Sequence, residues 1–406
     1  MSEKTIWVIN QFAGTPESGW GERHYFLAKG WLEQGHRVVI ISTGNNHMFK
    51  KPSRMEGLYT LENYQGVEFL WIKTPSYNPK NFTRFFAMFF FTASLLGLLW
   101  LKRKVGRPTY IIHSSMSIFP APMAYFLKNR LKAKQFIFEV RDLWPLTPIE
   151  LMGYSRRHPF IRIISWFEKF AYRKADKIVS VLQGSEKYIN KISLVPVKYH
   201  YLPNGFDLSL LPKSQSTNGQ TSHIPTDRLV VGYAGTIGFA NALDPFFEAI
   251  KSLATNEDSP FFVILGDGYM KETYAEQVAE CNNCLFISKV NKVSVSHYIS
   301  KFDICFIGWH TSNLYRYGVS ANKYFDYMAA AKPILSAQSG IIDPVKESGA
   351  GLIVDNTPKG IIDGLLQFSR MSPSDRKQLG EKGKEFVFKY HTYSQLSTSY
   401  LQILEQ

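Results

Sequence analysis

Short apolar segments alternate along the chain with longer segments of mixed polarity. Apolar runs that predict buried strands occur at 6–9, 37–42, 110–113, 135–139 and 175–181 in the first half of the chain. A second series occurs at 229–234, 262–265, 285–287, 304–307 and 351–354. Helical patterns separate many of these runs. Strands that alternate with helices are typical of parallel sheets, so the pattern predicts an α/β protein with two Rossmann-like domains.

A turn cluster and a polar stretch divide the two series. The cluster is Tyr201–Asp207, and the stretch Lys213–Arg228 is rich in Ser, Thr, Asn and Gln. A chain of 406 residues is long for a single core. We therefore expect one domain at residues 1–205 and a second at residues 206–389.

The segment Tyr315–Leu335 combines a glycine turn at Gly318, a helical pattern from about Ser320 to Ala331, and a strand start. Within the helix, Tyr324, Tyr327 and Met328 share one face. Lys332-Pro333 ends the helical pattern. The order of loop, helix and strand predicts part of a βαβ unit.

Charged residues lie at the front of this predicted helix. A helix N-terminus suits phosphate, and Arg316 and Lys323 add positive charge there. Asp326 follows one turn later, where a carboxylate can accept hydrogen bonds from a sugar diol. Phosphate and diol together describe a nucleotide. The alternative is an ordinary surface helix with a Lys323–Asp326 pair.

Glycine loops follow the first strand of each domain. In the second domain this loop holds Gly235, Thr236 and Gly238, whose backbone amides can meet a diphosphate. In the first domain Gly19 and Gly21 would let the backbone approach a ligand.

Polar residues accompany the first domain's loops. Arg23 and His24 could face donor or acceptor, although His24 could equally be a surface residue at a helix N-terminus. Arg141 and Asp142 follow the strand at 135–139, at the strand end where ligands bind in α/β sheets. The alternative for this pair is a salt bridge in a loop.

Three of these motifs resemble the retaining family 4 glycosyltransferases: VRDLWP at 140–145, GTIG at 235–238 and NKYFDYMAAAKPIL at 322–335. The sequence is most similar to the bacterial branch that builds surface polysaccharide on a lipid carrier, of the N-acetyl-L-fucosamine transferase type. The resemblance implies the GT-B fold, in which two Rossmann-like domains face a cleft. It also implies that residues 390–406 pack back on the first domain.

The resemblance implies roles for individual residues. Asp326 would hold the ribose, with Ser320, Asn322 and the 235–238 loop completing the donor site. Asp142 would lie near the acceptor hydroxyl. Many relatives carry a glutamate where this chain has Gly318, so the donor-sugar contact is assigned to Tyr317 or to backbone groups.

The implied reaction moves a sugar from a nucleotide-diphosphate sugar, with UDP as the expected nucleotide, to a lipid-linked saccharide in O-antigen or capsule synthesis. No Asp-x-Asp metal motif occurs, so we expect no metal and no cofactor beyond the nucleotide-sugar co-substrate. Asp142, Arg316 and Lys323 are the expected catalytic residues.

The densest apolar run spans Phe82–Leu101 and precedes the basic residues Lys102–Lys104. A buried helix and a membrane-surface helix with a basic flank explain it equally well, and a membrane span is the least favoured explanation. The resemblance favours a location at the inner leaflet.

The net charge of +14 and the sequence pI near 9.4 favour anionic partners. No nucleic-acid-binding motif is present, so we expect no nucleic acid partner. Three cysteines cannot form a closed disulfide framework, and no signal peptide is visible. We therefore expect a cytoplasmic protein, with peripheral membrane attachment as an extension. The alternatives are a nucleotide-sugar epimerase and a non-catalytic, basic membrane-surface protein.

Overall fold

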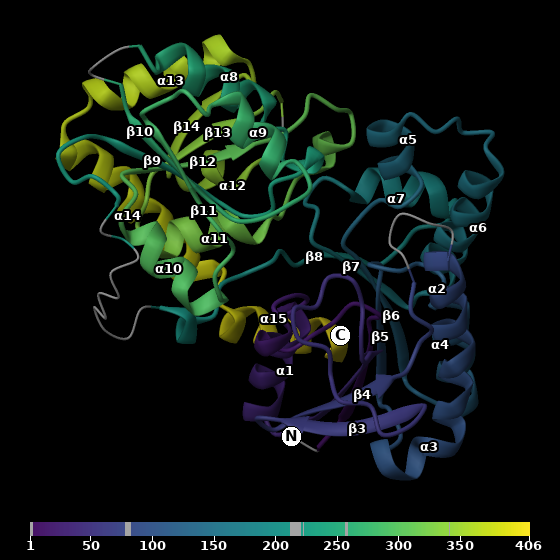
Figure 1. Ribbon diagram of the computed structural model, residues 1–406. Coiled ribbons are helices and arrows are strands. Elements are labelled where there is room, and N and C mark those ends of the chain that lie inside the picture. Colours follow the sequence, from purple (N-terminus) through teal and green to yellow (C-terminus); the bar gives the residue numbers. More distant parts are fainter. Residues whose placement is uncertain (1–2, 78–82, 212–220, 222, 256–258, 341) are drawn as a thin grey trace. The chain divides into compact units, whose positions relative to one another are not determined.

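The computed structural model describes residues 3–77, 83–211, 221, 223–255, 259–340 and 342–406. Phe82 and residues 213–220 and 222 of the expected linker lie outside these ranges. The described chain forms two compact units (Figure 1). Unit 1 comprises Met1–Pro203 and Tyr393–Gln406, and unit 2 comprises Asn204–Thr392.

Within the described residues, unit 1 holds an eight-stranded sheet in the order β3-β4-β2-β1-β5-β6-β7-β8. The strands are β1 (Thr5–Ile9), β2 (Arg37–Thr43), β3 (Tyr59–Tyr64), β4 (Val67–Ile72), β5 (Tyr110–Ser114), β6 (Gln135–Val140), β7 (Lys177–Ser180) and β8 (Tyr199–Tyr201). All neighbouring strands pair in parallel except β3 and β4, which form an antiparallel hairpin. The central strands are apolar runs because helices cover both faces of the sheet.

The helices of unit 1 cover both sides of this sheet (Figure 1). They are η1 (Pro16–Ser18), α1 (Arg23–Glu33), α2 (Thr83–Ser94), η2 (Leu95–Gly97), α3 (Leu98–Val105), α4 (Ala121–Leu131), α5 (Leu146–Met152), α6 (Pro159–Lys174), α7 (Glu186–Ser193) and α15 (Tyr393–Glu405). Helices α1 and α15 lie on one face, and α2, α4 and α6 lie on the other.

The last helix, α15, belongs to unit 1 and packs along α1. The Trp31 indole N–H donates to the Ser397 carbonyl at 3.0 Å, and the Trp31 and Tyr400 rings are 5.3 Å apart. Gly30 permits this approach, because a Cβ there would lie 2.1 Å from Ser397 Oγ. The sequence analysis placed this helix at residues 390–406, and the structure places it at Tyr393–Glu405.

Unit 2 has a parallel sheet which, in its described part, has six strands in the order β11-β10-β9-β12-β13-β14. The strands are β9 (Val230–Ala234), β10 (Phe261–Leu265), β11 (Cys284–Ile287), β12 (Ile304–Gly308), β13 (Ile334–Ala337) and β14 (Gly351–Val354). A core of buried aromatic and aliphatic side chains lies against the sheet, with the Phe246 and Phe306 rings stacked at 3.8 Å.

The helices of unit 2 lie on both faces of its sheet, with α8 and α13 on one face and α10, α11 and α14 on the other (Figure 1). They are η3 (Leu208–Leu210), η5 (Phe239–Asn241), α8 (Asp244–Leu253), α9 (Lys271–Gln277), α10 (Lys292–Ser300), η6 (Tyr315–Tyr317), α11 (Asn322–Ala329), α12 (Pro344–Ser348), α13 (Pro358–Arg370) and α14 (Pro373–Tyr390). Two α/β units with parallel sheets confirm the predicted fold class.

Helix α11 is shorter than predicted. It begins at Asn322 rather than Ser320 and ends at Ala329 rather than Ala331. Ala331 takes a positive φ of 53° and closes the turn before β13. The predicted shared face of Tyr324, Tyr327 and Met328 is confirmed, because all three are fully buried.

Candidate functional site

The start of α11 lies over the glycine loop that follows β9. The Tyr327 hydroxyl accepts from the Ala234 N–H at 2.8 Å and donates to the Ala234 carbonyl at 3.2 Å. These two bonds attach α11 to the end of β9. Ala321, the N-cap residue, makes no side-chain cap, so the amides of the first turn receive no side-chain acceptor from it.

Lys323 projects from this first turn toward the loop. Its Nζ donates to the Tyr233 hydroxyl at 3.1 Å and to Asn241 Oδ1 at 2.5 Å, and it lies 4.5 Å from the centre of the Tyr233 ring. A Cβ at Gly235 would lie 3.3 Å from Nζ, so glycine leaves room for this side chain. Burial lowers the pKa of Lys323 to about 7.

The partners of the Lys323 ammonium are neutral groups. A buried cation beside neutral dipoles gains strongly when an anion binds next to it. The uncapped helix N-terminus offers amide donors at the same place. Lys323, the 235–238 loop and the first turn of α11 can therefore hold an anionic group such as a phosphate.

The remaining loop residues have structural partners. The Thr236 carbonyl accepts from the Tyr233 hydroxyl at 2.6 Å and from Asn241 Nδ2 at 2.9 Å, while the Thr236 side chain is exposed. A Cβ at Gly238 would lie 3.1 Å from the Tyr269 ring. The loop is thus fixed from both sides, and its Gly235 and Ile237 amides donate to the carbonyls of Leu265 and Asp267 at 2.9 and 3.0 Å.

Asp326 and Arg316 do not join the Lys323 cluster. Asp326 lines a mostly apolar pocket of about 200 Å³ with Phe206 and Val295. Arg316 is exposed, donates to the Tyr317 hydroxyl at 2.7 Å and lies 4.9 Å from the Tyr317 ring centre. Lys323 contacts Tyr233 and Asn241, whereas Asp326 lines the pocket with Phe206 and Val295.

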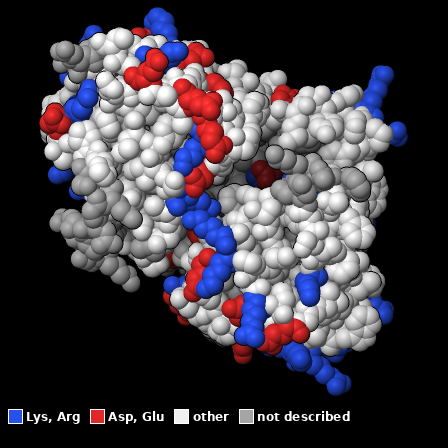
Figure 2. Space-filling view, viewed as in Figure 1, with Lys and Arg blue, Asp and Glu red and all other residues white. Residues whose placement is uncertain are grey.

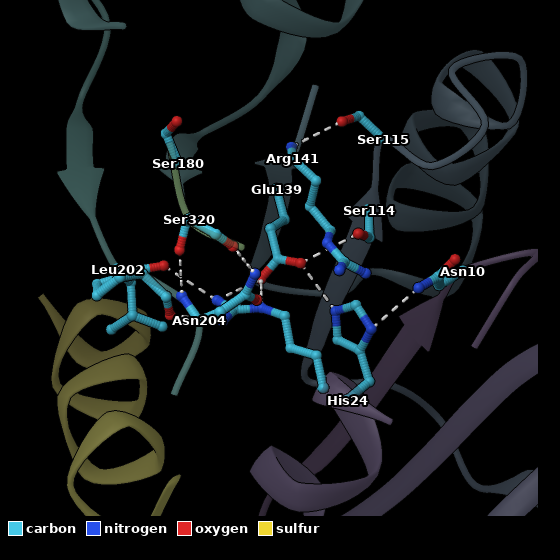
Figure 3. Close-up of polar contacts among 12 residues, drawn as sticks. Asn10, His24, Ser114, Ser115, Glu139, Arg141, Ser180, Leu202, Asn204 and Ser320 are labelled. Carbon is cyan, nitrogen blue, oxygen red and sulfur yellow. Dashed lines mark hydrogen bonds and ion pairs between the residues drawn. The ribbon is translucent and has the colours of Figure 1, made fainter. Parts of the chain in front are cut away.

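Ser320 and Asn322 differ in their surroundings. Ser320 Oγ accepts from the Asn204 N–H at 2.8 Å, and the Asn204 amide donates to the Ser320 carbonyl (Figure 3). Ser320 thereby joins the start of unit 2 to the loop before α11. Asn322 is exposed at the first helical position.

Unit 1 contains a buried charge cluster around Glu139, at the C-terminal part of β6 (Figure 3). Glu139 accepts from Arg23 at 3.2 Å, from His24 Nε2 at 2.9 Å and from Ser114 at 3.0 Å. His24 Nδ1 accepts from Asn10 at 3.0 Å. The alternative of a surface position for His24 is wrong, because the side chain is fully buried.

Electrostatics fix the charge states in this cluster. Burial alone would raise the pKa of Glu139, but the charge of Arg23 and the contact with His24 lower it below its ordinary value. Burial lowers the pKa of His24 despite the nearby carboxylate. Arg23, with two guanidinium nitrogens, also donates to the carbonyls of Leu202 and Pro203. The cluster therefore attaches the segment Leu202–Pro203, where the chain leaves unit 1, to α1.

Arg141 and Asp142 follow β6 on the loop that carries the VRDLWP motif. The Arg141 N–H donates to Ser115 Oγ at 2.8 Å, and the Trp144 indole donates to the Ser115 carbonyl at 2.5 Å. The Arg141 side chain reaches toward Glu139 and Ser114 (Figure 3). Asp142 is exposed, so its carboxylate can meet a ligand.

Gly19 and Gly21 have positive φ values of 71° and 79°. A Cβ at Gly21 would lie 2.2 Å from the Phe12 carbonyl oxygen, and the Gly14 N–H donates to the Gly21 carbonyl at 3.3 Å. The close approach of two loop segments therefore requires glycine at position 21, and the approach of a ligand there stays a prediction.

Sequence reasoning missed Glu139, Tyr233 and Asn241 as site residues. Glu139 carried a signal, since it is the single acid in the apolar strand QFIFEV. Tyr233 and Asn241 carried none, because their role depends on a contact with Lys323, more than eighty residues away. Among the described residues, no cluster of three or more His, Cys, Asp or Glu could hold a metal ion.

Two family models match the chain. Residues 18–205 match a glycosyl transferase 4-like domain, and residues 244–402 match a glycosyl transferase-like domain. No curated protein sequence matches the chain.

Solved structures share the fold over the full length. Sucrose-phosphate synthase from Thermosynechococcus elongatus is 15% identical with a TM-score of 0.72, covering 100% of this chain and 99% of that one. Anabaena Alr3699/HepE in complex with UDP and glucose is 12% identical with a TM-score of 0.68, covering 99% and 100%. WaaG, a glycosyltransferase involved in lipopolysaccharide biosynthesis, is 14% identical with a TM-score of 0.64, covering 97% and 98%.

Proposed function

We propose that this chain, which has the GT-B fold, is a retaining glycosyltransferase of the GT4 type that uses a nucleoside diphosphate sugar. UDP is the proposed nucleotide, and a hexose or acetamido sugar, including N-acetyl-L-fucosamine, is the proposed transferred group. The proposed acceptor is a lipid-linked saccharide of O-antigen or capsule synthesis. The proposed reaction is cytoplasmic and needs neither metal nor cofactor.

The observation that carries this proposal is the Lys323 ammonium beside Gly235. Departure of the nucleotide breaks the bond between the sugar C1 and a phosphate oxygen and leaves negative charge on that oxygen. Lys323 and the amides of α11 would stabilise this charge. Exposed Arg316 would approach the phosphate from the preceding turn, while Asp142 would face the acceptor hydroxyl in unit 1.

The ligands and roles of proteins with similar structures support the proposed donor and acceptor. Alr3699/HepE has been solved in complex with UDP-glucose, and WaaG acts in lipopolysaccharide biosynthesis. The acceptor in sucrose-phosphate synthase differs, so the fold alone leaves the acceptor open. For this chain, the apolar and basic character of unit 1 favours a lipid-linked acceptor.

The first experiment is a thermal shift assay with UDP, GDP, ADP and CMP in EDTA. A bound nucleotide at about a hundredfold over its Kd stabilises the native state by about 2.7 kcal/mol. A shift with UDP alone would support the proposed donor. Shifts that require added metal would contradict metal independence, and no shift with any nucleotide would contradict the donor site.

Asp326→Ala tests the proposed ribose contact. The variant should bind UDP more weakly, by on the order of tenfold, because one carboxylate-to-diol hydrogen-bonding pair is lost. Glu385→Ala is the matched control, since it removes an exposed carboxylate from α14 of the same unit. Equal UDP affinity in Asp326→Ala and Glu385→Ala would remove Asp326 from the donor site.

A further inference from the structure

The helical stretch α2–η2–α3 has two apolar faces, and one of them is exposed. The inner face, made by Ala87, Met88, Phe91, Leu95 and Leu98, is at most 1% exposed. The outer face carries large apolar side chains at helical spacing: Phe86 (63% exposed), Phe89 (47%), Leu96 (38%) and Trp100 (77%). Burial in the core therefore explains only the inner face.

Helix α6 extends this outer face. Ile163 and Trp166 are 49% and 56% exposed, and the Trp166 and Phe170 rings are stacked at 5.5 Å. The ring of Phe119 lies 4.8 Å from Phe89 and 5.1 Å from Phe167, which connects α2 with α6. We call the exposed set the aromatic face: Phe86, Phe89, Leu96, Trp100, Ile163 and Trp166.

Positive charge dominates the part of the sequence that carries the aromatic face. Residues 83–174, from the start of α2 to the end of α6, contain sixteen Lys or Arg and four Asp or Glu, a net charge of +12 in a chain of net charge +14. Two of those four acids, Glu139 and Glu168, are buried. In Figure 2 much of the surface over α2 and α6 is uncharged, and blue side chains gather at its edges.

Basic residues of α3 and α6 border the aromatic face. Lys102, Arg103 and Lys104 lie in the last turn of α3 and begin two residues after Trp100. On α6, Arg162, Lys169 and Arg173 share the helix with Ile163 and Trp166 and follow one another at helical spacing. Apolar rings bordered by lysine and arginine match the boundary between lipid headgroups and acyl chains.

We propose that the aromatic face binds the surface of a bilayer that contains anionic lipids, with Phe86, Trp100 and Trp166 inserted among the acyl chains. The basic residues at its border contact the headgroups. This surface belongs to unit 1 and its binding needs no nucleotide, so the inference is independent of the transfer reaction proposed above.

The helix lies on the bilayer and does not cross it. Thr83–Val105 has the length and apolar composition of a membrane span, by length and composition alone. Its inner face is bonded to the unit, because the Tyr59 hydroxyl donates to the Ser94 carbonyl at 2.6 Å and a Cβ at Gly97 would lie 2.1 Å from that hydroxyl oxygen. Crossing would break these contacts and expose the core.

A second copy of the chain fits this face less well. Two copies that each present the basic residues Lys102–Lys104, Arg162, Lys169 and Arg173 beside this face repel one another. Nucleic acid would satisfy the positive charge but would leave Phe86, Leu96 and Trp100 without an apolar partner. Anionic lipid satisfies both properties.

Co-sedimentation with vesicles of phosphatidylcholine, alone or mixed with phosphatidylglycerol, tests this proposal. The full chain should bind the mixed vesicles, and binding should weaken as salt is raised from about 50 mM to about 500 mM. The triple variant Lys102→Gln, Arg103→Gln, Lys104→Gln should bind on the order of a hundredfold more weakly. The double variant Phe86→Ser, Trp100→Ser should lose at least about tenfold.

Matched controls remove the same groups from exposed positions elsewhere. Lys346→Gln, Lys377→Gln, Lys382→Gln removes three charges from unit 2, and Leu58→Ser, Leu366→Ser removes two exposed apolar side chains. Both controls should bind like the parent, and the melting temperature of every variant should be close to that of the parent because every substituted site is exposed except Lys102, which is half-buried.

Three results would overturn the proposal. Parent-like vesicle binding by Phe86→Ser, Trp100→Ser would show that the aromatic face is not inserted. Binding to duplex DNA without binding to mixed vesicles would assign the surface to nucleic acid. A dimer in sedimentation velocity that Trp100→Ser dissociates would assign it to a second copy.

Discussion

Lys323 is a cation with neutral hydrogen-bond partners, and its pKa of about 7 makes anion binding pH-dependent. A bound diphosphate favours the charged form, so above pH 7 binding must add a proton to Lys323. We expect the affinity for UDP-glucose to fall by up to about tenfold per pH unit above 7. Calorimetric titration between about pH 6 and 9 measures this slope, and the sugar diphosphate does not itself titrate there.

Lys323→Arg is the control for this slope, because arginine stays charged throughout that range. Its affinity should be nearly flat with pH. Lys323→Met should bind at every pH about as weakly as the parent does at high pH. A flat profile for the parent would show that Lys323 does not contact the diphosphate.

Glu168 in α6 is a buried acid whose pKa burial raises to about 8. The hydroxyls of Tyr172 and Tyr188 donate to its two oxygens at 3.0 and 3.2 Å. Between about pH 4.5 and 8 the folded protein holds a proton that the unfolded chain lacks, so this group makes stability fall as pH rises. Glu168→Gln should stabilise unit 1 by about 1–3 kcal/mol at pH 8 and by little near pH 5.

Urea unfolding of the parent and Glu168→Gln at the two pH values measures this difference. Glu150→Gln, on α5 of the same unit, controls for the loss of a carboxylate outside the buried cluster. A gain that is equal at pH 5 and pH 8 would show that the proton on Glu168 is not its cause.

The spacing of residues within a short segment predicted which side chains share a face. It could not predict contacts between residues that are far apart in the sequence. The pattern placed Tyr324, Tyr327 and Met328 on one buried face, and the structure confirms this. The partners of Glu139 on α1 are separated from it by 115 and 116 residues. Such pairs depend on the order of the strands in the sheet. The periodicity of a short sequence window carries no information about that order.

At the scale of elements, the contact of α1 with α15 depends on Gly30, because a residue without a side chain lets the two helices approach closely. Ala normally stabilises a helix interior relative to Gly by about 1 kcal/mol. Gly30→Ala should instead destabilise unit 1 by about 1–3 kcal/mol, because its Cβ would lie 2.1 Å from Ser397 Oγ and 2.6 Å from Ser397 Cβ.

Chemical denaturation followed by tryptophan fluorescence tests this expectation. Gly57→Ala is the matched control, since a Cβ there meets nothing within 4 Å. Stabilisation by Gly30→Ala would mean that α15 can move away from α1 at little cost.

The apolar runs in the sequence predicted the central strands, but they did not predict the hairpin of β3 and β4. Its turn, Gln65-Gly66, has φ values of 50° and 93°, the positive values that tight two-residue hairpin turns require. Strand β3 is largely exposed or half-buried, so it lacks the apolar run that identified the others. Gly66, in this two-residue turn, was the feature of the sequence that could have predicted the hairpin.

The apolar run at 82–101 shows why composition alone left alternatives open. Its described part has a buried face and an exposed face on the same helices, so the burial explanation holds for Phe91 and fails for Phe86. Mean hydropathy counts both faces equally. Only the packing of these helices on unit 1, seen in the hydrogen bond from Tyr59 to the Ser94 carbonyl, distinguishes the two faces.

At the scale of the whole molecule, the last helix belongs to the first unit. A chain that ends at Thr392 would lose the buried side chains of Tyr393, Tyr400 and Leu404 from unit 1. Their loss should unfold or severely destabilise unit 1 while unit 2 keeps its fold and its affinity for UDP. Hydrogen exchange measured by mass spectrometry should show lost protection in residues 3–203 and unchanged protection in 223–392.

Equal loss of protection in both units would mean that unit 2 cannot fold without unit 1. Two units were predictable from chain length and the polar stretch after Asp207. The return of the last helix was not, because its periodicity shows an apolar face without showing which sheet it covers. That expectation came from the resemblance alone.

The chain leaves unit 1 at Pro203 and re-enters it at Tyr393, and each unit holds its two ends together. In unit 2 the Phe206 N–H donates to the His391 carbonyl at 2.9 Å. In unit 1 Arg23 donates to the Pro203 carbonyl at 2.6 Å, and the Phe26 ring stacks on Tyr393 at 5.2 Å, one turn further along α1.

Unit 2 is thus an insertion with adjoining ends, a topology that tolerates genetic excision. A gene that joins codon 203 to codon 393 through a short glycine linker would encode unit 1 as an unbroken polypeptide. Codons 204–392 would encode the complementary fragment, so lipid binding and nucleotide binding could be assayed on separately purified halves.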